Sequence, residues 1–187
     1  MKASTSTHDG HTGGTDPQSL PSRPSATTWR FPPLQARSLE GAVRDLPTAF
    51  AGDPSIVIVA FERHQQSDVD SWLPWLAGLR ERLPGLEVYE LPAIKRRWLP
   101  FRGFIDGGMR AGIPDPETRQ RTLTTYTDIG SLNRALRTDS TTAIALFVVS
   151  RNGSVVWSGR AAYDPETATG LERAATAARN DADRSEP

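Results

Sequence analysis

The stretch that decides the fold is residues 55–72, which have the sequence SIVIVAFERHQQSDVDSW. It begins with an unbroken, largely β-branched apolar run over 56–61, which is typical of a central strand covered on both faces. The chain then becomes polar at 62–66, and Ser67 or Asp68 offers a side-chain oxygen that caps a helix. Ligands of open α/β folds gather where such a strand ends and the next helix begins. We therefore place the candidate site at this turn.

Further strand and helix signals follow on both sides of this stretch. They are a hairpin within 34–46, a helix over 68–83, a strand over 86–91 ended by Pro92, a helical segment over 93–112 broken at Pro100 and Gly107-Gly108, a loop over 113–117, a strand over 121–127, a helix over 129–136, a strand over 143–150, a strand over 154–157 after an Asn152-Gly153 turn, and a last helix capped by Asp164. This order predicts an α/β fold with a mixed sheet and helices on both faces.

The domain boundaries follow from where the apolar periodicity starts and stops. Residues 29–179 carry the strand and helix patterns and suffice for one domain. Residues 1–28 are rich in Ser, Thr, Gly and Pro, and residues 180–187 are polar. Because neither segment can bury enough apolar surface to offset the entropy of ordering, we predict two disordered tails.

Composition narrows the function classes. Lys+Arg and Asp+Glu both number 22, so the chain lacks the overall basic charge on which nucleic-acid binding relies. Cys is absent, which excludes disulfides, thiolate nucleophiles, iron–sulfur clusters and thiolate zinc sites. No apolar run approaches the ~20 residues of a membrane span, and no signal-peptide core opens the chain. We expect a cytoplasmic protein with no direct membrane insertion, no metal and no cofactor.

Two spacings around the turn resemble the thioredoxin fold in its peroxiredoxin-like form. Members with a redox site carry a Phe five residues before the attacking Cys and a Pro eight residues after it. Counting from Phe61 and from Pro74 leads to the same position, which Gln66 occupies here. The resolving position is Val69, and the segment 139–142 lacks the cis-Pro that the family places before the next strand. The resemblance covers residues 31–179 and implies the fold, but no thiol activity.

A second resemblance is to the thioredoxin-like assembly factors of the mitochondrial ATP synthase. Those proteins are similar in a run ending Arg-x-x-x-Gln followed by Trp, in a basic Met-Arg segment, and in a strand pair closing on Trp-x-x-Gly. The corresponding stretches here are 61–72, 108–110 and 155–159. This resemblance implies help in building a membrane complex, with a protein as the partner. The absence of a targeting peptide departs from that family.

The predicted partner- or ligand-binding surface combines the loops that converge at one end of a parallel sheet. Its members are Arg63, His64, Gln65, Gln66, Asp106, Arg110 and Thr141. Nearby, the cations Lys95, Arg96 and Arg97 precede three interleaved aromatic residues, Trp98, Phe101 and Phe104. This pattern fits a solvated helix face or a partner patch, because interfaces favour Arg and aromatic side chains.

Three functions remain open, and the first is our main hypothesis. A non-catalytic binding or assembly module needs only an exposed surface. A small-anion binder would use the helix N-terminus with Arg63 or Arg110. A non-thiol enzyme on the same scaffold would use Ser67, His64 or Asp106, although Ser67 is better interpreted as a helix cap.

Overall fold

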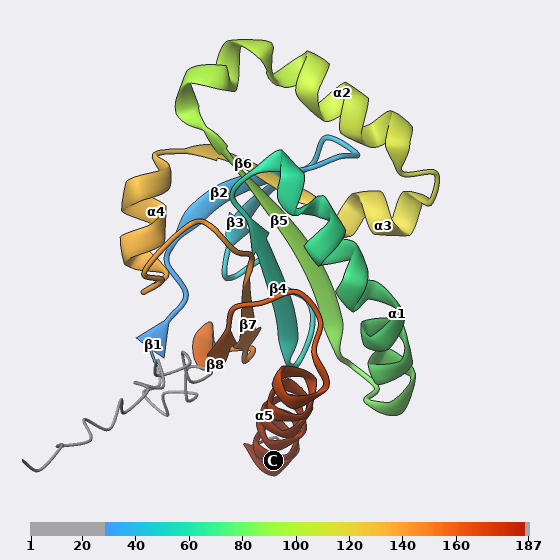
Figure 1. Cartoon of the computed structure of the whole chain (residues 1–187). Coiled ribbons are helices and arrows are strands. Elements are labelled where there is room, and N and C mark those ends of the chain that lie inside the picture. Colours follow the sequence, from blue (N-terminus) through green and yellow to red (C-terminus); the bar gives the residue numbers. More distant parts are fainter. Residues whose placement is uncertain (1–28, 186–187) are drawn as a thin grey trace, which may run out of the picture.

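The computed structural model describes residues 29–185, which form an eight-stranded mixed sheet with helices on both faces (Figure 1). The strands are β1 (Trp29–Arg30), β2 (Leu34–Ser38), β3 (Val43–Leu46), β4 (Ser55–Ala60), β5 (Glu87–Lys95), β6 (Leu123–Thr127), β7 (Ala145–Val149) and β8 (Ser154–Gly159). The helices are η1 (Arg63–Gln65), α1 (Gln66–Arg82), η2 (Arg96–Phe101), α2 (Arg102–Gly112), α3 (Pro116–Arg121), α4 (Ile129–Ala135) and α5 (Pro165–Ser185). The predicted fold class is confirmed.

The sheet is built outward from β4. Its order is β1-β8-β7-β4-β5-β6-β2-β3, with β5 parallel to β4 and β7 antiparallel to it. Ile56, Val57, Ile58 and Val59 are each 0% exposed, as a strand with two covered faces requires. The helix α1 connects β4 to β5, and this crossover brings the ends of both strands to one edge of the sheet.

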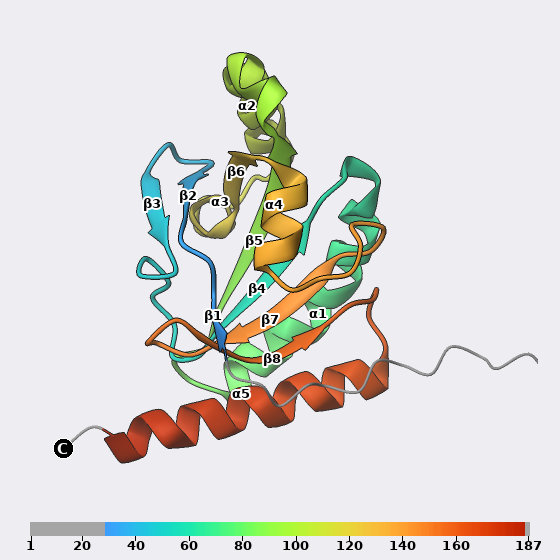
Figure 2. The ribbon, with the colours of Figure 1, turned by 90° about the vertical axis from the view of Figure 1, so that its left-hand side faces the viewer.

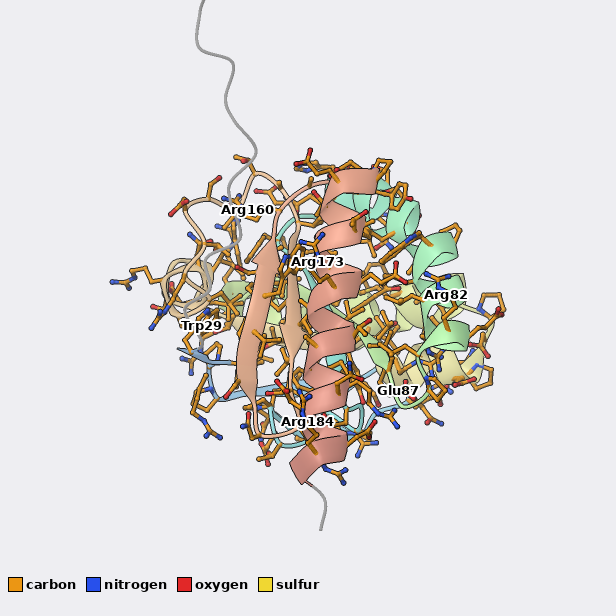
Figure 3. All side chains as sticks on the ribbon, turned by 90° about the horizontal axis from the view of Figure 1, so that it is seen from below. Trp29, Arg82, Glu87, Arg160, Arg173 and Arg184 are labelled. Carbon is orange, nitrogen blue, oxygen red and sulfur yellow. The ribbon has the colours of Figure 1, made fainter. Side chains whose placement is uncertain are left out.

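Two apolar layers fill the space between the sheet and its helices. On one face, Ile56 and Ile58 pack with Trp72 and Leu76 of α1 and with Leu171 of α5. On the other face, α4 and the segments around the buried Phe31 and Phe50 cover the sheet; the apolar residues of that layer include Val57, Val59, Leu91, Leu132 and Leu136. Figure 3 shows α5 lying across β7 and β8, beside α1. Successive side chains of β4 point to opposite faces of the sheet, so this strand contributes residues to both layers.

Turn and cap signals explain several element boundaries. Gly41 (φ +94°) lies in the β2–β3 turn and Gly153 (φ +83°) in the β7–β8 turn, a backbone conformation that glycine adopts without strain. The Asp128 carboxylate accepts a hydrogen bond from the backbone N–H of Ser131 at the start of α4 (2.7 Å). The Asp164 carboxylate accepts from the N–H of Thr167 at the start of α5 (2.9 Å). The predicted Asp164 cap is confirmed, and Asp128 caps α4 in the same way.

Three predicted boundaries are wrong. The strand β5 does not end at Pro92 but continues to Lys95, and Pro92 lies opposite Ala60 of β4. The helix α2 runs through Gly107 and Gly108 without a break. The expected loop at 113–117 contains the start of α3, whose first residue is Pro116. The strand β1 begins at residue 29, where the predicted domain begins; it was not among the predicted strands, and it pairs with β8.

The C-terminal tail also needs correction. The helix α5 runs from Pro165 to Ser185, so residues 180–185 are helical although we predicted disorder from residue 180 onward. The sequence was misleading because these residues are polar, whereas a surface helix needs only its inner positions to be apolar. The predicted disorder of residues 1–28 lies outside the described residues, as do residues 186–187.

The packing of β7 gives a direct test of the sheet. Leu146 is 0% exposed and lies opposite Ile58 of β4. We expect Leu146→Ala to lower the free energy of unfolding by ~2–5 kcal/mol, because it removes buried apolar volume and leaves a cavity. Denaturant unfolding checks this, with the exposed Val43→Ala as the control, for which we expect a change below about 0.5 kcal/mol. Equal losses in the two variants would contradict the assignment of β7 to the core.

Candidate functional site

The turn after β4 is organised by the side chain of Gln65. This side chain is 0% exposed, and its Oε1 accepts hydrogen bonds from the backbone N–H groups of Phe61 (2.8 Å) and Glu62 (3.2 Å). Its Nε2 donates to the backbone carbonyl of Thr141 (2.8 Å). One buried amide therefore joins the end of β4 to the loop that precedes β7, 76 residues further along the chain.

The loop before β7 is held from a second direction by Arg160. The Nη2 of Arg160, which follows β8, donates to the backbone carbonyl of Ser140 (2.8 Å). Within the loop, the Ser140 hydroxyl accepts from the N–H of Thr142 (3.0 Å). The turn and the loop are thus fixed to each other and to the end of β8, so Thr141 lies beside the turn as predicted.

Two interpretations of the turn change with this geometry. Gln65 was predicted to contact a partner, but a fully buried side chain cannot do so, and its role is structural. The helix α1 begins at Gln66 after the short η1, so neither Ser67 nor Asp68 is its N-cap, contrary to the prediction. The sequence pattern missed η1 because its capping residues are Glu62 and Gln65, which bond to each other's backbone N–H groups.

The remaining turn residues face solvent. Arg63, His64 and Gln66 are exposed, and the Nε2 of Gln66 donates to the carboxylate of Asp70 one turn along α1 (2.9 Å). The Ser67 hydroxyl donates to the backbone carbonyl of His64 (3.4 Å) rather than to its imidazole. A serine nucleophile needs a base that accepts this proton, so the geometry does not form a Ser–His pair.

Asp106 and Arg110 belong to a separate group of contacts. The Tyr126 hydroxyl donates to the Asp106 carboxylate (2.8 Å), and Arg110 forms an ion pair with Glu40 (3.4 Å). Burial and the Asp106 carboxylate both raise the pKa of Tyr126 above its ordinary value. These two residues anchor α2 to β6 and to the β2–β3 turn. Among residues 29–185, no hydrogen bond or ion pair connects either of them to the turn at 63–66.

The two groups nevertheless lie at the same end of the sheet. The turn follows β4 and η2 follows β5, and these parallel strands end at the same edge. Figure 1 shows α2 crossing beyond this edge, while α1 starts below it. The sequence-based prediction of a common end is therefore correct, although the predicted single patch consists of two separately anchored parts.

Exposed apolar side chains concentrate on the part formed by η2 and α2. Most of the large exposed hydrophobic residues belong to it; they are Trp98, Leu99, Phe101 and Phe104. Phe104 is 87% exposed, the largest fraction among them. The sequence already showed aromatic residues interleaved with cations here, but it could not show that they remain uncovered.

One partly buried carboxyl group was not predicted. Glu90 lies on β5 in a shallow groove between α1 and α3, and the groove is also lined by Leu73, Arg80 and Arg121. Burial raises the pKa of Glu90 above its ordinary value, and the nearby Asp70 carboxylate raises it further. The sequence did contain a signal for this position. Side chains alternate between the two faces of a strand, so Glu90 lies on the same face as Val88, which is the face covered by α1. Residues 29–185 contain no cluster of three His, Asp or Glu side chains arranged to hold a metal ion.

The comparisons with known proteins identify the fold. The thioredoxin domain of a thiol-disulfide oxidoreductase from Bacteroides vulgatus is 14% identical and has a TM-score of 0.52, covering 80% of this chain and 98% of that chain. BsSco, of the Sco family of cytochrome c oxidase assembly proteins, is 9% identical with a TM-score of 0.53, covering 81% and 96%. A DsbE-type thiol:disulfide interchange protein from Chlorobium tepidum is 16% identical with a TM-score of 0.50, covering 80% and 95%.

These likenesses show a thioredoxin-like fold and nothing finer, because the identities are low. No family model matches the chain, and no curated protein sequence does either. The chain has no Cys, so it is not a thiol oxidoreductase despite these structural neighbours. None of the described helices is long and apolar enough to cross a membrane.

The Gln65 contacts predict a large stability effect at a polar position. Gln65→Leu keeps a similar side-chain size but leaves the buried N–H of Phe61, the part-buried N–H of Glu62 and the Thr141 carbonyl without their partner. We expect it to lower the free energy of unfolding by at least about 2 kcal/mol. Gln66→Leu is the matched control, and because Gln66 is exposed we expect a change within about 0.5 kcal/mol. We call the three hydrogen bonds of the Gln65 side chain the clamp. Similar denaturation midpoints for both variants would contradict a stabilising role of this clamp.

The Glu90 environment predicts a dependence of stability on pH. Since the folded-state pKa is raised, Glu90 stabilises the fold below its ordinary pKa of 4.5, and this contribution is lost as the pH rises through the raised value. Glu90→Gln should therefore unfold at a higher temperature than the parent protein at neutral pH, and the difference should shrink toward pH 4.5. Thermal unfolding across this range tests it. A variant that is less stable at neutral pH would mean that the carboxylate is favourably paired.

Proposed function

We propose that this protein is a non-catalytic binding module on a thioredoxin-like scaffold, and that its partner is a protein. The proposed contact surface is formed by the exposed turn residues Arg63, His64 and Gln66 together with the loop 140–142. We call this set the turn surface. It includes Gln66, the position that the spacing from Phe61 and Pro74 assigns to the attacking Cys of redox-active thioredoxin-like proteins.

The observation that carries the proposal is the clamp made by Gln65. A buried amide satisfies two backbone N–H groups of the turn and one carbonyl of the loop, so the turn surface is held in one shape before any partner arrives. Preorganised surfaces bind with a smaller loss of conformational entropy. The same turn presents Gln66 where a thiolate would act, and an amide is no nucleophile.

The class of partner is suggested by the second resemblance and by one structural neighbour. BsSco belongs to a family of assembly proteins for cytochrome c oxidase, a membrane complex. The segments 61–72 and 108–110 resemble assembly factors of another membrane complex. Both support the proposal that the partner is a subunit of a complex under assembly, which the turn surface holds without changing it chemically.

The experiment is affinity capture with matched charge reversals. Arg63→Glu changes the turn surface, and Arg173→Glu makes the same charge change at an exposed position of α5, outside the turn surface. We expect the native protein to retain a specific protein partner from its host. Arg63→Glu should weaken this capture at least about tenfold, the loss typical of a residue that carries binding energy, and Arg173→Glu should not.

Two outcomes would count against the proposed function. Equal losses from the two charge reversals would leave only non-specific electrostatic attraction. A small anion that co-purifies with the protein and is lost in Arg63→Glu would favour an anion binder instead.

A further inference from the structure

We propose that residues 95–112 form an arm that docks on the surface of an anionic lipid bilayer. The arm comprises η2, α2 and the preceding Lys95. This inference goes beyond the proposed function, uses a different surface, and can fail or succeed independently of it. Nothing in it requires a membrane span, because the arm lies along the bilayer surface.

The direction in which α2 faces is fixed by its anchors. Asp106 accepts a hydrogen bond from Tyr126, so this side of the helix faces the body of the protein. Successive residues are about 100° apart around a helix, which places Phe104 roughly 200° from Asp106. Phe104 therefore points away from the body, in agreement with its 87% exposure. Figure 2 shows α2 standing beyond the rest of the fold at one end of the molecule.

The outward side of the arm carries apolar groups. Phe101 is 58% exposed and Trp98 is 44% exposed, and they lie in edge contact with each other beside Phe104 in the sequence. A Cβ atom built at Gly107 or Gly108 would meet nothing within 4 Å, so these outward positions face open space. A patch of this kind, with no covering element, marks a surface that docks on something.

The cations of the arm favour an anionic occupant. Lys95, Arg96 and Arg97 form no ion pair with any carboxylate among residues 29–185. The acidic residue of the arm, Asp106, faces the body. A second copy docked through the same face would bring these cations against their equivalents. That repulsion argues against self-association and for a negatively charged surface.

The depth order of the groups favours a lipid bilayer over an acidic protein. Phe104 is the most exposed aromatic side chain of the arm, whereas Arg102 lies one helical turn before Asp106, on the side of α2 that faces the body. Interfacial helices have this arrangement: aromatic side chains enter the boundary of the acyl chains while Lys and Arg remain at the level of the headgroups. Because the arm projects, it can also meet a flat surface before other elements do.

The test uses the purified full chain with two kinds of vesicle. One kind contains phosphatidylcholine alone, and the other contains phosphatidylcholine with phosphatidylglycerol. We expect sedimentation with the anionic vesicles only, weakened by added salt because the attraction is screened. Lipids with brominated acyl chains should quench the fluorescence of Trp98, and the Trp98→Phe variant should lose this component.

Matched variants separate docking by the arm from general charge attraction. Phe104→Ser should abolish most binding, whereas Val43→Ser, at an exposed position of β3, should not. Each cation near an anionic surface contributes about fivefold in affinity, so removing Arg96 and Arg97 together (R96Q/R97Q) should weaken binding roughly twenty-five-fold. Removing Arg151 and Arg173 (R151Q/R173Q) makes the same change in net charge outside the arm and should have little effect.

Three results would overturn the proposal. They are the absence of binding to anionic vesicles, equal losses from the two double variants, and binding without quenching of Trp98. The second and third would indicate surface adsorption without docking of the arm. A dimer that Phe104→Ser dissolves, or a protein captured through Phe104 without any vesicle binding, would assign the arm to another occupant. Arg63→Glu should leave vesicle binding unchanged, which keeps this test separate from that of the turn surface.

Discussion

The structure depends on one buried amide. Gln65 connects the end of the central strand β4 to the loop before β7 through three hydrogen bonds, at a point where the sheet ends and α1 begins. Burying a polar group without a hydrogen-bond partner destabilises the folded state. Because one amide has to satisfy all three bonds, each bond also limits where the other two partners can lie. The turn therefore has one shape, set by contacts inside the protein rather than by a ligand.

This constraint gives the sheet end two parts with different chemistry. The turn surface is polar and fixed by Gln65, whereas the arm is apolar on its outward side, basic, and anchored through Asp106 and Arg110. The thioredoxin-like scaffold places both at the edge where β4 and β5 end. Gln66 stands where a redox-active member of this fold would carry a thiol. The turn around it keeps a fixed position and shape, and a surface of fixed shape is suited to binding.

The sequence was informative where a local pattern has one structural solution. The apolar run 56–61, the Asn152-Gly153 turn and the Asp164 cap predicted a strand, a hairpin and a helix start that the structure contains. The sequence was misleading where tertiary contacts decide where an element ends or whether a side chain is buried. Pro92 lies within a strand, at the last pair that β5 makes with β4 and just before β5 pairs with β6. Gln65 and Gln66 are the same residue type, and only the fold shows that one is buried and the other exposed. The arm could be recognised by composition, but its exposure depends on which elements cover it.

The most direct test of the clamp is amide hydrogen exchange at the turn. The N–H groups of Phe61 and Glu62 have a side-chain oxygen as their acceptor, so their protection reports on Gln65 and not on a helix or strand ladder. We expect both amides to exchange far more slowly than the amide of the exposed Arg63, and Gln65→Leu to remove this difference. Exchange of Phe61 and Glu62 as fast as that of Arg63 in the native protein would contradict the clamp.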